Sequence, residues 1–107
     1  MEKRRKLYLN NYEVESEGAT TPFLVAVSLG ELLFHPNQDI YSRDVLFRGE
    51  LRRKIQGCQG ESILLTEEEY NALRSAVDSW NRYDGSHEEL IKRVTGAEEV
   101  EVDITEV

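Results

Sequence analysis

Apolar residues dominate the segment from Pro22 to Phe34 and surround nearly its whole helical axis. This pattern predicts a central helix from which water is mostly excluded. Pro22 suits the first position of such a helix because the fixed φ of proline is helical. The segment is also short, rich in valine and interrupted by Gly30, so a buried strand is the alternative interpretation. Both interpretations place the segment in the core.

The next apolar repeat predicts a helix over 43–56, in which large apolar residues recur at every fourth position. Ser42 can cap the start of this helix, and Gly57 can end it in a left-handed conformation. Five basic and two acidic residues lie within the range, so the helix carries a charge of +3. Its outward faces are therefore predicted to be basic.

Three consecutive glutamates, Glu67 to Glu69, follow Thr66 and open a third predicted helix. Thr66 and Glu69 have the spacing of a capping box, in which each side chain accepts a hydrogen bond from the other residue's backbone N–H. The positive end of the helix dipole stabilises Glu67 and Glu68. A metal site is disfavoured, because successive helical side chains diverge by about 100° around the axis. We therefore interpret the three glutamates as structural.

The third helix is predicted to end at Asp84-Gly85. Ser86 and Glu89 form a second capping box, which predicts a short last helix that ends at Gly96. The predicted buried stripe of the third helix comprises Tyr70, Leu73, Val77 and Trp80.

Residues that favour β-structure predict strands near both ends of the chain. Residues 6–16 form the first predicted strand, and 61–65 form a short extended stretch before the third helix. Residues 99–105 alternate strictly, which predicts a half-buried strand with Val100, Val102 and Ile104 on one face. Residues 1–107 are thus predicted to form a single α+β domain. Its three or four helices pack on a small sheet formed mainly by N- and C-terminal strands, to which 61–65 can add a third.

The formal net charge of −8 is unevenly distributed, since residues 1–6 carry +3 and residues 7–107 carry −11. Such a field disfavours direct binding to nucleic acid or to anionic lipid and favours cationic partners. One cysteine excludes an internal disulfide, and with two histidines it cannot complete a structural zinc site. No apolar run approaches the length of a membrane span, so we expect a cytoplasmic protein.

No catalytic motif is complete, and the sequence predicts no enzyme, no cofactor and no metal ligand. His35 follows the first helix, where it can act as a base or ligand but more readily caps terminal carbonyls. Cys58 lies between glycines and is interpreted as a small loop residue rather than a reactive thiol. His87 is expected to be exposed and neutral in the first turn of the last helix.

Five residues are candidates for contact with a partner. Arg48 and Arg52 lie four apart on one predicted helix face, where they can hold an anion together, and Arg53 adjoins them. Pairing with acidic segments of the same fold or of an acidic partner is the favoured interpretation. Glu101 and Asp103 belong to the acidic face of the last strand, which can protect a sheet edge or meet a basic partner.

Three segments together are similar to small accessory proteins of tailed bacteriophages. They are "LGELLFHP" from Leu29, "SRDVLFRGELRRKI" from Ser42 and "ILLTEEEYNALRSAV" from Ile63, and they span residues 29–77. The similarity lies in size, charge and the residues that begin and end helices. It implies a phage- or prophage-encoded protein that works in the host cytoplasm, and it transfers no catalytic position.

The expected function is therefore non-enzymatic binding to another protein, either a second copy or a host or virion component. One alternative is an acidic inhibitor that occupies a basic nucleic-acid channel of a host enzyme. Another is a small enzyme that uses His35 or Cys58, which requires a pocket that holds one of them beside a second polar group.

Overall fold

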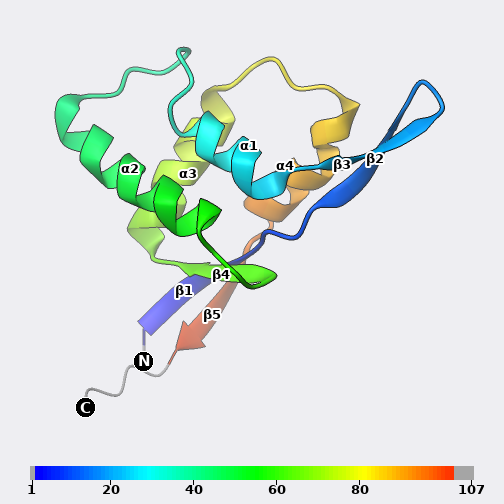
Figure 1. The fold of residues 1–107 in the computed structure, drawn as a ribbon. Helices are drawn as coiled ribbons and strands as arrows, with labels where there is room; N and C mark the ends of the chain where they lie inside the picture. The colour runs from blue at the N-terminus through cyan, green and yellow to red at the C-terminus, as the bar shows by residue number, and fades with distance from the viewer. Residues whose placement is uncertain (1, 103–107) are drawn as a thin grey trace.

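An antiparallel sheet brings the two ends of the chain together in the computed structural model, which describes residues 2–102 (Figure 1). The central strand β1 (Glu2–Tyr8) pairs with β4 (Ser62–Leu65) on one side and with β5 (Glu98–Val102) on the other. The predicted sheet of N- and C-terminal strands, with the short stretch before the third helix, is confirmed.

Four α-helices of the described chain lie on one side of this sheet (Figure 1). They are α1 (Val25–Leu32), α2 (Ser42–Gln56), α3 (Glu67–Ser79) and α4 (Glu88–Thr95), and the 3-10 turn η1 (Gly85–His87) precedes the last. Helix α3 contacts β1 and β4, while α1 packs against both α2 and α3. The core between them contains the fully buried Leu7, Leu29, Leu33, Leu51, Ile55, Leu65, Leu73 and Leu90. The α+β prediction is correct.

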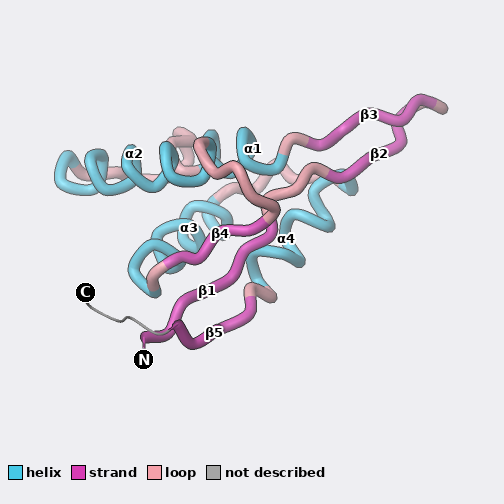
Figure 2. Tube along the Cα trace, turned by 60° about the horizontal axis from the view of Figure 1, so that its bottom comes forward, coloured by secondary structure: helices cyan, strands magenta, loops and turns pink. Residues whose placement is uncertain are grey.

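The predicted strand over 6–16 is in fact interrupted, and its second half forms a separate hairpin. Strand β2 (Tyr12–Ser16) pairs with β3 (Ala19–Phe23), and the two project from the body of the protein (Figure 2). Glu17 and Gly18 connect them with φ angles of 52° and 79°. Two consecutive positive φ angles are typical of the tight turn that matches the twist of paired strands.

Helix α1 begins three residues later than predicted, because Pro22 belongs to the hairpin, where it pairs with Glu13. The helical interpretation was correct and the strand alternative was wrong. The side chain of Leu24, at the N-cap, makes no capping hydrogen bond. The side chain of Asn11 supplies the cap instead: Asn11 Oδ1 accepts a hydrogen bond of 3.0 Å from the Val25 N–H. The chain segment before the hairpin thus caps the helix that follows the hairpin.

Helix α2 has almost the predicted bounds and ends at Gly57 as predicted, but Ser42 is not its cap and Gly57 is not left-handed. Tyr41 occupies the N-cap without a side-chain hydrogen bond, and Ser42 is already helical. Gly57 ends the helix at φ −90°, so no left-handed residue is required there.

Helix α3 ends at Ser79, five residues before the predicted stop, and 80–84 are not helical. The second capping box also differs from the prediction. Asp84, not Ser86, is the capping residue: its carboxylate accepts a 2.8 Å hydrogen bond from the Ser86 N–H, and the His87 side chain completes the box. This box starts the 3-10 turn, and α4 continues from it.

Strand β5 is half-buried, as predicted, with Val100 and Val102 partly buried and its glutamates exposed, but the valines lie on the face of the sheet away from the helices. In the register, Arg5 lies opposite both Leu65 and Glu99, so Glu99 shares a face with the fully buried Leu65. Val100 and Val102 therefore lie on the face away from the helices, together with the half-exposed Leu64. Asp103 and Ile104 lie outside the described residues. Among residues 2–102, no helix has both the length and the apolar character needed to cross a membrane.

Candidate functional site

The three glutamates at the start of α3 are structural, as predicted. Thr66 Oγ1 accepts a 3.0 Å hydrogen bond from the Glu69 N–H, and Glu69 Oε1 accepts a 2.9 Å hydrogen bond from the Thr66 N–H. Lys54 Nζ on α2 donates to the same oxygen at 2.8 Å. Burial raises the pKa of Glu69, but the bonds from Lys54 and Thr66 outweigh it, and the pKa is lowered overall.

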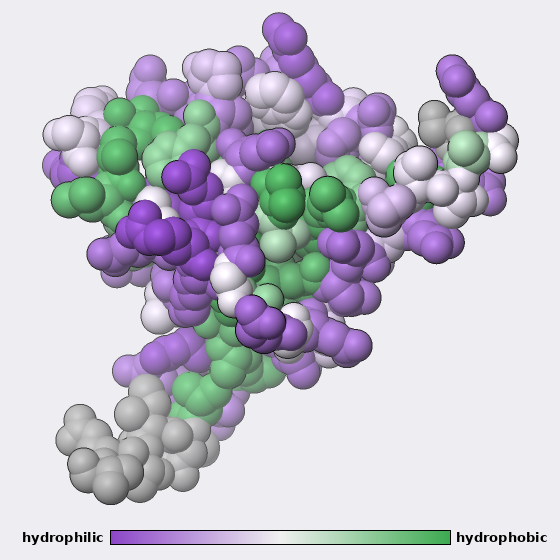
Figure 3. All heavy atoms as spheres, viewed as in Figure 1, coloured by the Kyte–Doolittle hydropathy of each residue, from purple (hydrophilic) through white to green (hydrophobic). Residues whose placement is uncertain are grey.

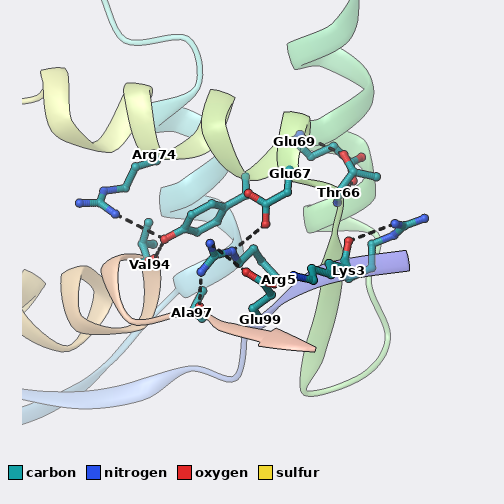
Figure 4. A network of polar contacts seen from close by, with 11 residues as sticks. Lys3, Arg5, Thr66, Glu67, Glu69, Arg74, Val94, Ala97 and Glu99 are labelled. Atoms are coloured by element: carbon teal, nitrogen blue, oxygen red, sulfur yellow. Dashed lines mark hydrogen bonds and ion pairs between the residues drawn. The ribbon is translucent and has the colours of Figure 1, made fainter. Parts of the chain in front are cut away.

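Glu67 belongs to a network around Arg5 that connects the sheet to α3 (Figure 4). Arg5 Nε donates to Glu67 Oε1 at 2.8 Å, and its guanidinium lies 4.9 Å from the ring centroid of Tyr70. Arg5 Nη1 also donates to the Ala97 carbonyl at 3.2 Å, and Glu99 lies within 3.5 Å of Nη2. The hydrogen bond to Glu67 raises the pKa of Arg5. The acidic side chains thus pair with cations of the same fold.

Two of the predicted partner-binding arginines are occupied within the fold. Arg48 Nη1 donates to the Leu33 carbonyl at 3.0 Å and to Gln38 Oε1 at 2.6 Å, which satisfies the end of α1. The guanidinium of Arg52 lies 4.7 Å from the ring centroid of Phe34. The two arginines do lie on one face of α2, but this face packs against the α1 segment. Their partners are a carbonyl, an amide and a ring, not the acidic segments expected.

The other three candidates are not gathered at one site. Arg53 is exposed on α2, and Glu101 is exposed on β5 opposite Lys3. Asp103 lies outside the described residues. Strand β5 does lie at the edge of the sheet, the position in which its acidic residues could protect that edge from unwanted pairing. Within residues 2–102, no group of histidine, cysteine, aspartate and glutamate side chains is arranged to hold a metal ion.

Cys58 is a partly buried loop residue that packs against the core. Its Sγ lies 3.5 Å from the Ser62 carbonyl and 3.7 Å from the Gly60 carbonyl, which are distances for weak S–H donation. Both contacts are local, so the position of the thiol agrees with the structural interpretation.

His35 is buried, with 7% of its surface exposed, and does not cap its own helix. Its Nδ1 accepts a 3.1 Å hydrogen bond from the Asn37 N–H, which places the proton of the neutral ring on Nε2. Nε2 lies 3.0 Å from the Ala76 carbonyl and 2.9 Å from Ser79 Oγ on α3. Nε2 therefore connects the segment after α1 to α3, while Nδ1 is used by the local loop, so neither nitrogen is available as a base.

A cleft of about 180 Å³ lies beside His35, between α1 and the segment that follows α3. Four rings line it, those of His35, Trp80, Tyr83 and His87, and Glu31 contributes a carboxylate. The rings of His35 and Trp80 are 5.0 Å apart and inclined by 55°, and those of Tyr83 and His87 are 5.1 Å apart and inclined by 63°. Neither pair is a parallel stack, and all four residues line the cleft.

The polar groups of the cleft are held by the backbone around it. The Tyr83 hydroxyl donates to the Val77 carbonyl at 2.8 Å, and the Asp84 N–H donates to His87 Nδ1 at 3.1 Å. Burial, and then the charge of Asp78, raises the pKa of Tyr83 to about 12. His87 is partly buried against Phe23, not exposed as predicted. Glu31 and His35 lie four residues apart, but Trp80, Tyr83 and His87 come from one segment about 50 residues later, so the sequence did not indicate that these side chains meet.

The second surface of interest is the start of α2, where large apolar side chains are exposed. Leu46 is 76% exposed, Tyr41 is 64% exposed and Val45 is 44% exposed. Figure 3 shows hydrophobic side chains gathered over this end of the helix. We call Tyr41, Val45 and Leu46 the α2 surface. The guanidinium of Arg43 lies 5.5 Å from the Tyr41 ring centroid, so a cation borders it.

Comparison with known proteins found no matching family model, no matching curated protein and no matching solved structure.

Proposed function

We propose that this protein binds another protein, and that the α2 surface is where it does so. The observation that carries the proposal is the exposure of Leu46, Tyr41 and Val45 at adjacent positions. Single exposed apolar residues are common, whereas a group of large ones on one helix end is typical of interaction sites. Tyrosine and arginine are also enriched among the residues that contribute most to protein interfaces.

The charge of α2 indicates the kind of surface that fits it. Helix α2 carries five basic and two acidic residues, and Arg48 and Arg52 are turned toward α1. Arg43 and Arg53 remain exposed beside the apolar side chains. The partner surface is therefore an apolar patch or amphipathic helix bordered by carboxylates. It belongs to another protein or to a second copy of this chain, and the phage-encoded accessory role stays a prediction.

The test compares the wild-type protein with Leu46→Asp. An aspartate at this position introduces a charge into the centre of the apolar contact and repels carboxylates at its border. Loss of a central interface residue costs about 2 kcal/mol or more, so affinity for a captured partner should fall about 30-fold. Light scattering at increasing concentration measures self-association, and affinity capture from host lysate followed by titration measures another partner.

Leu24→Asp is the matched control. Leu24 is 47% exposed and occupies the N-cap of α1, where aspartate is a preferred residue, so the same substitution should leave the fold intact. Binding lost in Leu46→Asp and kept in Leu24→Asp supports the α2 surface. Equal binding by both variants, or a monomer that captures nothing, would refute the proposal.

A further inference from the structure

The cleft between α1 and the segment after α3 has a composition suited to one class of ligand. Its walls are the rings of His35, Trp80, Tyr83 and His87, and its one acidic side chain is Glu31. Aromatic faces carry negative potential and attract ammonium and guanidinium groups, and a nearby carboxylate adds an ionic contact. We propose that the cleft binds an organic cation, either the head group of a lysine or arginine side chain or a small free amine.

Glu31 is available for such a ligand. It is exposed on α1, and none of the ion pairs formed within residues 2–102 involves it. Three acids at the start of α3 and on β5 differ in this respect, since Glu67 and Glu99 share Arg5, and Glu69 binds Lys54. A cation that enters the cleft therefore finds a carboxylate that no internal cation has neutralised.

The surrounding charges favour the same ligand. After burial, the charge of Asp78 contributes to the raised pKa of Tyr83, although Asp78 is itself paired with Arg74. The Tyr83 hydroxyl is also committed to the Val77 carbonyl, which holds the ring in place. An anionic ligand would meet the carboxylate of Glu31, and among residues 2–102 no lysine or arginine lines the cleft. The chain-wide charge of −8 adds long-range attraction for cations.

The size of the cleft limits what can enter. Sites for drug-sized molecules enclose roughly 300–1,000 Å³, whereas this cleft holds about 180 Å³. That space suits a single head group such as a trimethylammonium or guanidinium, with the rest of the ligand outside. The histidine rings serve as walls here: His35 uses both nitrogens within the fold, so no acid-base step is assigned to it.

The protein contains one tryptophan, Trp80, and it lines the cleft, so its fluorescence reports binding directly. Choline and N-acetyl-arginine amide are titrated at constant ionic strength, beside 3,3-dimethylbutanol, which has the shape of choline without its charge. Saturable fluorescence change with the cations and none with the alcohol is the expected result. Stronger binding by arginine-containing peptides than by choline identifies a protein side chain as the source, and the reverse order identifies a small amine.

Glu31→Gln should weaken cation binding about fivefold, the upper range for an exposed ion pair. Glu50→Gln, on the exposed side of α2, changes net charge equally and should leave the affinity unchanged. Leu46→Asp should also leave the Trp80 response unchanged, which separates this proposal from the one on the α2 surface. Circular dichroism checks that each variant is folded. No saturable response to either cation, an equal response to the alcohol, or unaltered affinity in Glu31→Gln would overturn the proposal.

Discussion

Two glycines in neighbouring helices provide a sharp test of how α1 and α2 pack. Gly49 lies within α2, and a Cβ added there would meet only the Arg53 guanidinium, at 3.5 Å or more. That is an ordinary contact with the mobile end of a side chain. Gly30 lies within α1, and a Cβ there would overlap the Gln56 side chain and come within 2.9 Å of Arg52 Cγ. Both glycines are thus helical, but only Gly49 has room for an added methyl group.

Gly49→Ala is expected to stabilise the protein. Replacing glycine by alanine inside a helix reduces the entropy lost on folding and contributes about 0.5–1 kcal/mol. For a domain of this size the melting temperature should rise by about 2–8 °C. Gly30→Ala has the same helical preference, but an overpacked contact costs about 1–3 kcal/mol. Its net effect should therefore range from no gain to a loss of about 2 kcal/mol.

Urea and thermal denaturation followed by far-ultraviolet circular dichroism measure both variants. An unchanged urea m-value is required, because only then does the midpoint report stability alone. An equal gain in both variants would refute the close approach of the helices at Gly30. A loss of stability in Gly49→Ala would refute the ordinary contact expected between the added methyl group and Arg53.

Three further predictions concern individual side chains. Thr66→Ala should lower the free energy of unfolding by about 1 kcal/mol in urea denaturation, because it removes half of the capping box; no loss would contradict the cap. The folded-state pKa of Glu69 is lowered, so its charged form stabilises the fold above the ordinary pKa of 4.5, and this contribution is lost as the pH falls through the lowered value. The stability difference between wild type and Glu69→Gln should therefore narrow in acid, and a constant difference would argue against the Lys54 contact. The pKa of Tyr83 is raised, so its neutral form stabilises the fold below the ordinary pKa of 10.0, and this contribution is lost as the pH rises toward about 12. Absorbance titration should show late tyrosinate formation that Tyr83→Phe reduces by one group, because the pKa of Tyr12 is also raised by burial.

Some elements of this protein were determined by residues within one helical turn of each other. The capping box of Thr66 and Glu69 was predicted correctly because both its hydrogen bonds connect residues three apart. The helical range of α2 and the sheet from both ends of the chain also followed from local patterns. Such signals do not depend on where the rest of the chain lies.

Tertiary structure decided which faces are buried and which side chains meet. Strand alternation predicts two faces but not which one meets the helices, and the register with β1 placed Val100 outward. Pairing within a hairpin placed Pro22 in a strand although its φ also suits a helix start. The cleft requires Glu31 and Trp80 from segments about 50 residues apart, so no local pattern predicts it. Contacts between distant residues depend on the whole packing arrangement, which a window of neighbouring residues does not contain.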